Sequence, residues 1–359
     1  MNRPTSTPLE AVLELARWAP SGDNTQPWRF EITDPTHVVV HGFDTREDCL
    51  YDFQGRASQI ALGALLQNIE LAASLQGWVP HFTLKPESTE TSTLVDVQFQ
   101  QVTGTPSHPL ATFIRERSVQ RRPFSTHPLT GNEKTALSES LGPDHTVFWI
   151  EGAGKRLQMA RLMSQTGRLR LTIPEAYQVH KKVIEWKSRH SEDKVPDQAI
   201  GLDPVTLKLM RWVMQSWHRV NFFNTWLGGT WTPRLELDIL PAWFCGAHFV
   251  LQARTPPKTT QNYLDAGRAL QRFWLTATRL GLQLQPEMAP LIFHRYASSN
   301  VAPSLIPGTM QAVKSISQAL SKSTGEPETL EHAVFMGRIG HSFPARARSL
   351  RLPLSKLGL

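Results

Sequence analysis

Two segments of this chain repeat one another at an offset of 204 positions, residue 62 aligning with residue 266, and this constrains the fold more than any other feature. Residues 62–77 read LGALLQNIELAASLQG and residues 266–281 read AGRALQRFWLTATRLG. The identical pairs are Gly63/Gly267, Leu66/Leu270, Gln67/Gln271, Leu71/Leu275, Ala73/Ala277 and Gly77/Gly281. Apolar residues at three- and four-residue steps predict amphipathic helices over Gln59–Gln76 and Ala266–Leu280. We interpret the pair as an internal duplication and expect the two helices to pack about a pseudo-twofold axis.

The duplication suggests a division of the chain into two similar halves. Strand-like segments at His81–Leu84 and Thr93–Phe99 follow the first helix, and a proline-containing connection follows at Thr105–Pro109. The predicted halves are therefore residues 1–108 and 109–359. The second half is longer because it contains an insertion at about residues 152–260, which has several helical stretches.

The insertion is rich in aromatic residues, notably Trp212, Trp217, Trp226, Trp231 and Trp243. Met210, Val213, Met214 and Trp217 recur at helical spacing, which favours ordinary core packing. The alternative is that the segment from Arg211 to Trp243 forms a lid over a planar ligand. The sequence leaves both interpretations open.

Composition excludes several classes of protein. The chain has 359 residues, 40% hydrophobic and 19% charged, which is typical of a globular protein. Its formal charge of +7 favours anionic ligands, but the basic residues are scattered and no nucleic-acid motif accompanies them. The two cysteines and the thirteen histidines show no metal-type spacing. We therefore expect no metal and no nucleic-acid partner.

The sequence also lacks the features of a secreted or membrane-spanning chain. The start, MNRPTSTPLE, has no apolar core of a signal peptide, and the apolar run at Trp243–Leu251 is too short to cross a bilayer. We expect a cytoplasmic protein with no membrane partner.

A polar loop follows the first predicted helix, Leu9–Trp18. The stretch APSGDNTQPWRF, residues 19–30, offers the hydroxyl of Ser21, the flexible Gly22 and the amides of Asn24 and Gln26. Ordinary turn chemistry between a helix and a strand at Trp28–Ile32 explains this composition equally well. The alternative is that the loop binds a polar, planar ligand.

Four arginines lie within eight residues directly after the boundary between the halves, in Arg115-Glu-Arg-Ser-Val-Gln-Arg-Arg-Pro-Phe124. Guanidinium groups at this density suit bidentate phosphate binding, and an exposed charged turn has the same pattern.

Taken together, the loop and the arginine motif resemble the FMN-dependent nitroreductase family. Its members carry an arginine-rich motif, an APSxxNxQPW-type loop, a GLG-type helix end and a short basic C-terminal strand. The corresponding segments here are residues 115–124, residues 19–28, Leu280-Gly281-Leu282 followed by Gln285-Pro286-Glu287, and the ending FMGRIGHSFPARARSLRLPL. The resemblance covers nearly the full chain and implies an α+β fold of three-layer α/β/α type with mainly antiparallel sheets.

The resemblance implies a set of cofactor-binding residues but no catalytic residue. Arg117 and Arg121 match the positions that hold the FMN phosphate, with Arg348 and Arg351 as further candidates. The loop residues Pro20, Ser21, Asn24 and Gln26, and the segment with Gln285 and Pro286, match positions that lie along the flavin. Val119 departs from the pattern, because the family usually has Ser or Thr there.

The order of the motifs is a second departure. In an ordinary family member the arginine motif precedes the loop, whereas here the loop comes first. The chain therefore resembles the two-lobed branch of the family, in which two fused halves form an intrachain pseudo-dimer. Whether two such chains pair again is left open.

The implied activity is a flavin-dependent electron transfer. NAD(P)H would be the transient donor, and a nitroaromatic, a quinone or a similar small molecule the acceptor, in a ping-pong hydride mechanism. The alternative is a flavin-binding or storage protein whose insertion covers the FMN and prevents turnover.

Overall fold

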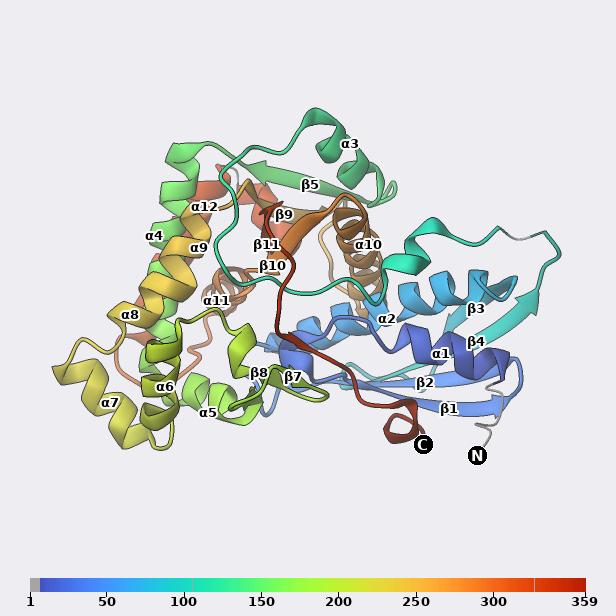
Figure 1. The fold of residues 1–359 in the computed structure, drawn as a ribbon, viewed down its shortest axis with the longest axis horizontal. Helices are drawn as coiled ribbons and strands as arrows, with labels where there is room; N and C mark the ends of the chain where they lie inside the picture. Colours follow the sequence, from blue (N-terminus) through green and yellow to red (C-terminus); the bar gives the residue numbers. More distant parts are fainter. Residues whose placement is uncertain (1–6, 105, 326) are drawn as a thin grey trace.

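The two helices that repeat one another, α2 (Arg56–Ser74) and α10 (Thr260–Arg279), pack side by side at the centre of the molecule (Figure 1). The structure is a computed structural model that describes residues 7–104, 106–325 and 327–359. Residues 1–6 at the start of the chain and Thr105, in the predicted connection, lie outside the described residues. The predicted contact between the two helices is present.

Each half has the same arrangement of elements. The first consists of α1 (Pro8–Ala16), β1 (Trp28–Asp34), β2 (His37–Phe43), α2, β3 (Trp78–Leu84) and β4 (Ser92–Gln101). The second consists of α3 (Gly131–Glu139), β5 (His145–Ile150), β9 (Ala247–Ala253), α10, β10 (Leu282–Pro286) and β11 (Ala333–His341).

The sheets of the two halves have one topology. The strand order is β1-β2-β4-β3 in the first sheet and β5-β9-β11-β10 in the second, and all neighbours are antiparallel. In each half the long helix connects the second strand to the third. The fold is therefore α+β with antiparallel sheets, as expected, and the shared topology supports the internal duplication that we propose.

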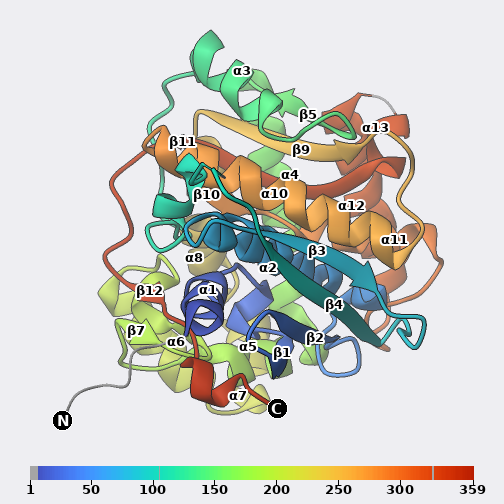
Figure 2. The same ribbon diagram turned by 90° about the vertical axis from the view of Figure 1, so that its right-hand side faces the viewer.

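The two additional segments belong to the second half. The insertion between β5 and β9 contains α4 (Ala153–Thr172), α5 (Pro174–Val183), β6 (Ile184–Glu185), β7 (His190–Ser191), β8 (Val195–Pro196), α6 (Pro204–Val213), α7 (Trp217–Trp226), α8 (Trp231–Arg234), a π-helix (Leu235–Ile239) and α9 (Leu240–Trp243). Between β10 and β11 lie α11 (Ala289–Ser298), α12 (Thr309–Thr324) and α13 (Pro327–Glu331). Figure 2 shows α10 between the second sheet and α2.

Two glycines allow α2 and α10 to approach closely. A Cβ atom at Gly63 would clash with the carbonyl oxygen of Leu264, and one at Gly267 would clash with that of Ile60. These two contacts are equivalent under the offset of 204. Two polar pairs between the helices are also equivalent under this offset. Gln271 donates to Asn68 Oδ1 at 2.7 Å, and Arg272 donates to Gln67 Oε1 at 2.8 Å.

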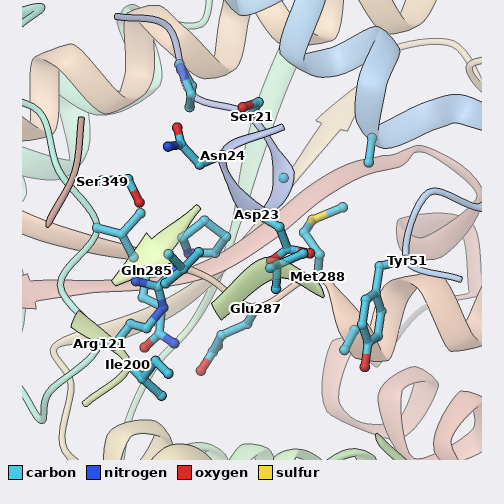
Figure 3. A pocket seen from close by; sticks show the side chains of 18 of the residues that line it. Ser21, Asp23, Asn24, Tyr51, Arg121, Ile200, Gln285, Glu287, Met288 and Ser349 are labelled. Atoms are coloured by element: carbon cyan, nitrogen blue, oxygen red, sulfur yellow. The ribbon is translucent and has the colours of Figure 1, made fainter. Parts of the chain in front are cut away.

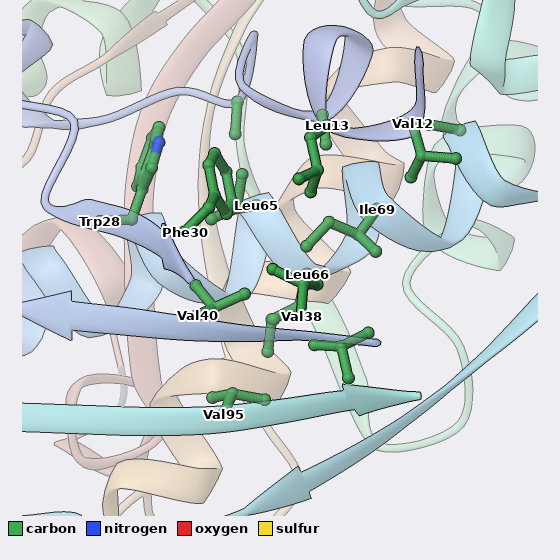
Figure 4. Close-up of a cluster of buried hydrophobic side chains, with 14 of the residues drawn as sticks. Val12, Leu13, Trp28, Phe30, Val38, Val40, Leu65, Leu66, Ile69 and Val95 are labelled. Atoms are coloured by element: carbon green, nitrogen blue, oxygen red, sulfur yellow. The ribbon is translucent and has the colours of Figure 1, made fainter. Parts of the chain in front are cut away.

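The hydrophobic cores of the halves share residues across this contact. The first core packs α1 and α2 on the first sheet, with Leu13, Phe30, Val38 and Ile69 among its buried residues (Figure 4). Leu264 of the second half belongs to this core, and its equivalent Ile60 belongs to the core of the second half. Each half therefore completes the core of the other.

Two extended arms cross between the halves. Residues 109–124 run along the second half, where Val119 forms a parallel bridge with Leu284. The carboxyl-terminal residues return to the first half, where Phe30 N–H donates to Leu357 O at 2.8 Å and Leu359 N–H donates to Phe30 O at 3.0 Å. The last residues, although predicted as part of 109–359, thus extend the sheet of the first half.

Candidate functional site

The arms, the loop after α1 and the insertion enclose a cavity of about 410 Å³ beside the contact of α2 and α10 (Figure 3). Most of the candidate residues from the sequence line it: Pro20, Ser21, Asn24, Arg117, Arg121, Gln285, Pro286, Arg348 and Arg351. The sequence hypothesis about which residues share a site therefore corresponds to one place in the fold. Their role in cofactor binding stays a prediction.

Three of these residues form a cluster of cations that we call the arginine cluster: Arg117 and Arg351, which are buried, and Arg348, which is half-buried. Arg117 is only 3% exposed, and its guanidinium lies 4.6 Å from the Trp274 ring and donates to Trp18 O at 3.1 Å. Arg348 donates to Arg117 O at 3.1 Å, and Arg351 donates to Ala19 O at 2.8 Å. Among the described residues no ion pair joins the cluster to a carboxylate.

The cluster is electrostatically unsatisfied. Burial, together with the charges of Arg351 and Arg348, lowers the pKa of Arg117 well below its usual value, and burial with the nearby Arg348 and Arg17 lowers that of Arg351 to about 9. Because guanidinium groups stay protonated at neutral pH, these shifts express the cost of holding cations together away from water. The Nε atoms of Arg117 and Arg348 are buried without a hydrogen-bond partner. An anion with several oxygens, such as a phosphate, fits this donor set.

Arg121 occupies a different part of the cavity. Its guanidinium donates to Ala199 O at 3.3 Å. Burial lowers its pKa, whereas the charge of Asp23 raises it. The structure therefore separates the two residues to which the sequence hypothesis gave the main phosphate role: Arg117 lies with Arg348 and Arg351, and Arg121 lies beside an acid.

Gln26 does not line the cavity. Its side chain is fully buried, and its amide nitrogen donates to Asn24 O at 3.1 Å and Glu192 O at 2.9 Å. Its amide oxygen accepts from Leu352 N–H at 2.9 Å. These bonds use the donors and the acceptor of the amide. The structure thus gives Gln26 the role of joining the loop to the insertion and to the carboxyl-terminal arm.

The side-chain amide of Asn24 has a hydrogen-bonded nitrogen and an oxygen without a partner. Its amide nitrogen donates to Glu192 O at 3.1 Å and Lys194 O at 3.2 Å, while its oxygen is buried without a partner. Asp23, Asn24 and Gln26 all have positive φ angles, of 49°, 63° and 48°. Such angles are unusual outside glycine, and they persist where surrounding contacts fix the backbone. The loop is held in one shape by its contacts with the insertion.

An apolar wall lies next to the arginine cluster. Ile60, Ala61 and Ala64 of α2 and Leu270 and Trp274 of α10 supply it. The alanines have small side chains, and Trp274 presents a large aromatic surface. A cationic cluster beside an apolar wall suits an organic anion with a flat ring system.

A buried charged pair, which the sequence reasoning did not predict, forms the base of the cavity. Glu287 lines the cavity, and its Oε2 lies 2.6 Å from Nδ1 of the fully buried His248. Nε2 of His248 lies 2.8 Å from Ala242 O, so both ring nitrogens face acceptors and both carry protons. Burial alone would lower the pKa of His248, but the Glu287 carboxylate raises it well above its usual value.

Gln285 is fixed by a second buried cation. Arg338 is fully buried and donates to Gln285 Oε1 at 2.8 Å and to the carbonyl oxygens of Arg121 and Arg122 at 3.0 and 2.8 Å. The Gln285 amide nitrogen has no hydrogen bond among the described residues and is available to a ligand. A histidine within the apolar strand 247–253 and a Glu directly after Gln285-Pro286 were the sequence signals for this network.

We expect Glu287→Gln to make the stability of the protein depend on pH in a new way. In the wild type the pairing of His248 stabilises the folded protein fully at pH values below the ordinary histidine pKa of about 6.5. This stabilisation is lost only as pH rises through the raised pKa that His248 has in the folded protein. In the variant, a neutral His248 can accept from the new amide, but a protonated one loses its counter-charge. The free energy of unfolding should therefore fall by about 1.5–3 kcal/mol at acidic pH and by less at alkaline pH.

The matched control is Glu31→Gln. Glu31 Oε2 also lies 2.7 Å from a histidine nitrogen, that of His41, but both side chains are at least one-third exposed. An exposed pair contributes under about 1 kcal/mol. Urea unfolding of both variants at pH 5.5 and 8.5 measures the difference. Equal losses at the two pH values for Glu287→Gln would contradict the assignment of a charged His248.

The insertion lines the cavity with both apolar and ionisable side chains. Met210, Leu237 and Asp238 line it, as do His180 and Arg170. Arg170 pairs with the buried Asp238 at 2.5 Å. Burial lowers the pKa of His180 to about 3, with a further contribution from Arg170, so this ring is neutral.

The tryptophans of the insertion do not line the cavity. Trp217 packs at 5.4 Å from Tyr177, next to the buried Met214, which agrees with the core interpretation of that helical stripe. Trp212, Trp226 and Trp231 are exposed to solvent. The insertion therefore contributes to the wall through Met210, Leu237 and Asp238 and not through its tryptophans. The lid formed by the segment from Arg211 to Trp243 stays a prediction.

Three further searches of residues 7–104, 106–325 and 327–359 gave negative results. No group of three or more His, Cys, Asp or Glu side chains could hold a metal ion. Both Cys49 and Cys245 are free thiols. None of the described helices combines the length and the apolar character needed to cross a membrane.

Sequence comparisons find relatives in Mycobacterium tuberculosis, and no family model matches the chain. The chain is 29% identical over 156 residues to "Uncharacterized protein Rv3127", a match covering 42% of this chain and 45% of the relative. It is 23% identical over 303 residues to "Putative NAD(P)H nitroreductase Rv3131", covering 80% of this chain and 78% of that relative. With "Putative NAD(P)H nitroreductase acg" it shares 27% identity over 171 residues, 51% of that relative.

The matches to the first and third of these relatives span about half of their length. A solved structure, a crystal structure of a putative nitroreductase from Anabaena variabilis, matches with a TM-score of 0.46 and 11% identity, over 96% of this chain and 90% of that one. The sequence relatives confirm the resemblance to the nitroreductase family that the loop and the arginine motif indicated.

Proposed function

We propose that this chain binds FMN in the cavity between its halves and transfers electrons from NAD(P)H to a nitroaromatic, a quinone or a similar small acceptor. The observation that carries the proposal is the arginine cluster: three cations, two of them buried, without a carboxylate partner among the described residues and beside an apolar wall. The names of two of the mycobacterial relatives, NAD(P)H nitroreductases, point to the same class of reaction.

Different residues of the cavity would contact different parts of the FMN. Arg117, Arg348 and Arg351 would hold the phosphate, and Trp274 with the apolar residues of α2 and α10 would contact the ring system. The free donor of Gln285 and the free acceptor of Asn24 are suited to polar ring-edge atoms. A bound FMN would supply the hydride and electron chemistry, which amino-acid side chains lack.

The protein itself would therefore bind and orient the flavin and exclude water from it. The His248–Glu287 pair holds a charged carboxylate at the cavity wall, and the walls of the insertion keep solvent from the apolar surface. These residues act by position, so we assign none of them as a nucleophile or an acid-base catalyst.

A flavin-holding protein without turnover is the second candidate. It is favoured by the insertion, because Met210 and Leu237 line the cavity and could restrict the approach of a donor. Hydride transfer requires donor and acceptor atoms within about 3–3.5 Å, so a rigid cover would prevent it.

Anaerobic mixing with NADH and NADPH separates the two candidates. We expect the purified protein to be yellow, to bleach with one of these donors, and to regain its colour with a quinone or a nitroaromatic. Met210→Ala with Leu237→Ala opens the cover, while removal of residues 222–231, which do not line the cavity, serves as the control. Bleaching only in the opened variant would favour the flavin holder, and a colourless protein that takes up no FMN would contradict both.

A further inference from the structure

A helical segment of the insertion projects from the body of the protein with its apolar side chains in solvent. We call residues 204–234, which comprise α6, α7 and α8, the aromatic hairpin (Figure 1). No residue of α6 is buried, and in α7 only Val220 is. Trp226 is 75% exposed and Trp231 is 65% exposed. The other exposed apolar residues of the hairpin are Val205, Leu209, Trp212, Phe222 and Leu227.

Two subsets of these side chains lie close together. Val205, Leu209 and Trp212 are spaced by four and three residues, which places them on one face of α6. Phe222 and Trp226 are spaced by four on α7, and together with Trp212 they line one shallow groove. A patch of this kind on a protein surface marks a contact with a partner or a membrane.

The charge of the hairpin is of one sign. Residues 204–234 include Lys208, Arg211, Arg219 and Arg234 and contain no Asp or Glu. Arg219 lies 4.4 Å from the Trp212 ring, and Arg234 lies 5.1 Å from the Trp231 ring. Exposed tryptophans beside basic residues match the interface of an anionic bilayer, where indole rings settle at the headgroups and cations meet lipid phosphates.

A second copy of this chain is a poorer occupant of the same surface. A symmetric dimer through the hairpin would place the four cations of each chain against those of the other. Asp203 and Glu236, two acids that flank the hairpin in the sequence, lie at its base, where Glu236 accepts from the backbone N–H of Asp203 at 2.7 Å. No acid of the hairpin could offset the repulsion.

We propose that the aromatic hairpin docks this protein on the surface of an anionic lipid bilayer. The docking is peripheral and uses side chains that the cavity does not, so it is independent of the proposed flavin chemistry. It differs from the expectation of no membrane partner, which rested on the lack of a spanning segment. Met210, on α6, lines the cavity, so the docked face adjoins the proposed site.

Vesicle flotation with the full-length protein tests the proposal. Vesicles of phosphatidylcholine containing phosphatidylglycerol should carry the wild type upward, whereas pure phosphatidylcholine vesicles should carry much less. Lys208→Gln with Arg211→Gln should weaken binding to the anionic vesicles by roughly twentyfold, because each basic residue near such a surface contributes about fivefold. Trp226→Ser with Trp231→Ser should also weaken it, by about tenfold or more.

The matched control is Leu305→Ser with Phe343→Ser, which removes two exposed apolar side chains from other parts of the chain. This variant should float like the wild type, and all variants should keep the wild-type melting temperature. Wild-type protein that does not float, or hairpin variants that float as the wild type does, would overturn the proposal. Sedimentation velocity measures the oligomeric state. If the wild type does not bind vesicles but forms a dimer that Trp226→Ser with Trp231→Ser converts to a monomer, the hairpin is a dimer interface and the proposal is wrong.

Discussion

Replacing Arg348 and Arg351 together with alanine should weaken FMN binding by about a hundredfold or more. Each charge-assisted hydrogen bond to a phosphate contributes about 1.5–3 kcal/mol, and every 1.4 kcal/mol is a factor of ten. The single change Arg348→Ala should cost the free protein little stability. It removes one bond to Arg117 O but also one of three mutually repelling cations. If Arg348 had only a structural role, its replacement would lower the stability of the free protein and leave FMN affinity largely unchanged.

Two control variants sharpen this test. Arg346 is exposed, precedes Arg348 by two residues and does not line the cavity, so Arg346→Ala should leave FMN affinity unchanged. Arg121→Ala should weaken FMN binding less than Arg348→Ala, because Arg121 lies beside Asp23 and not in the arginine cluster. Fluorescence titration of the apoprotein measures all four variants. If Arg121→Ala had the larger effect, the phosphate would lie elsewhere in the cavity.

The second large effect concerns the contact between the halves. Gly63→Ala should lower the free energy of unfolding by about 3 kcal/mol or more, because the added methyl group meets the backbone of Leu264, which cannot rotate away. Gly267→Ala should have a similar effect, since its Cβ meets the backbone of Ile60. Similar losses at both positions are expected only if the contact is pseudosymmetric.

Gly154→Ala is the control, because Gly154 also lies in a helix, α4, but has open space at the Cβ position. This change should be neutral or stabilising by up to about 1 kcal/mol. Urea unfolding measures the three variants. A Gly63→Ala protein as stable as the wild type would mean that the two long helices do not pack as closely as the structure shows.

The long helices could be predicted from the sequence because their pattern is strong and local. The windows Gln59–Gln76 and Ala266–Leu280 correspond to α2 and α10, whose observed starts are three and six residues earlier. The starts differ because α10 begins at a capping box of Thr259 and Asn262, which lies outside the apolar repeat. Likewise α1 ends at Ala16, two residues before the predicted end at Trp18.

The site was predictable as a set of residues but not as a geometry. Motif resemblance indicated which residues gather, because the loop, the arginines and the carboxyl-terminal arm are each short sequence signals. It could not show that the Gln26 amide is used by the backbone of Glu192 and Leu352, which are distant in sequence. Nor could it show that Arg121 faces Asp23, because side-chain direction depends on how the arm packs.

The insertion was the least predictable part. The helical spacing of its aromatic residues favoured core packing and left a lid as the alternative, since amphipathic helices with aromatic residues serve both purposes. Only the packing of α6 and α7 shows that Trp217 is partly covered while Trp226 and Trp231 face solvent. The buried pair of His248 and Glu287 was missed because a pair separated by 39 positions leaves no local pattern.

Titration of the apoprotein with FMN and with riboflavin, which has the same ring system but no phosphate, tests the central claim most directly. We expect one FMN per chain, bound at least a hundredfold more tightly than riboflavin, with the difference nearly abolished by Arg348→Ala and Arg351→Ala together. Equal affinity of wild-type protein for the two flavins, or no binding of either, would contradict a flavin phosphate held by the arginine cluster.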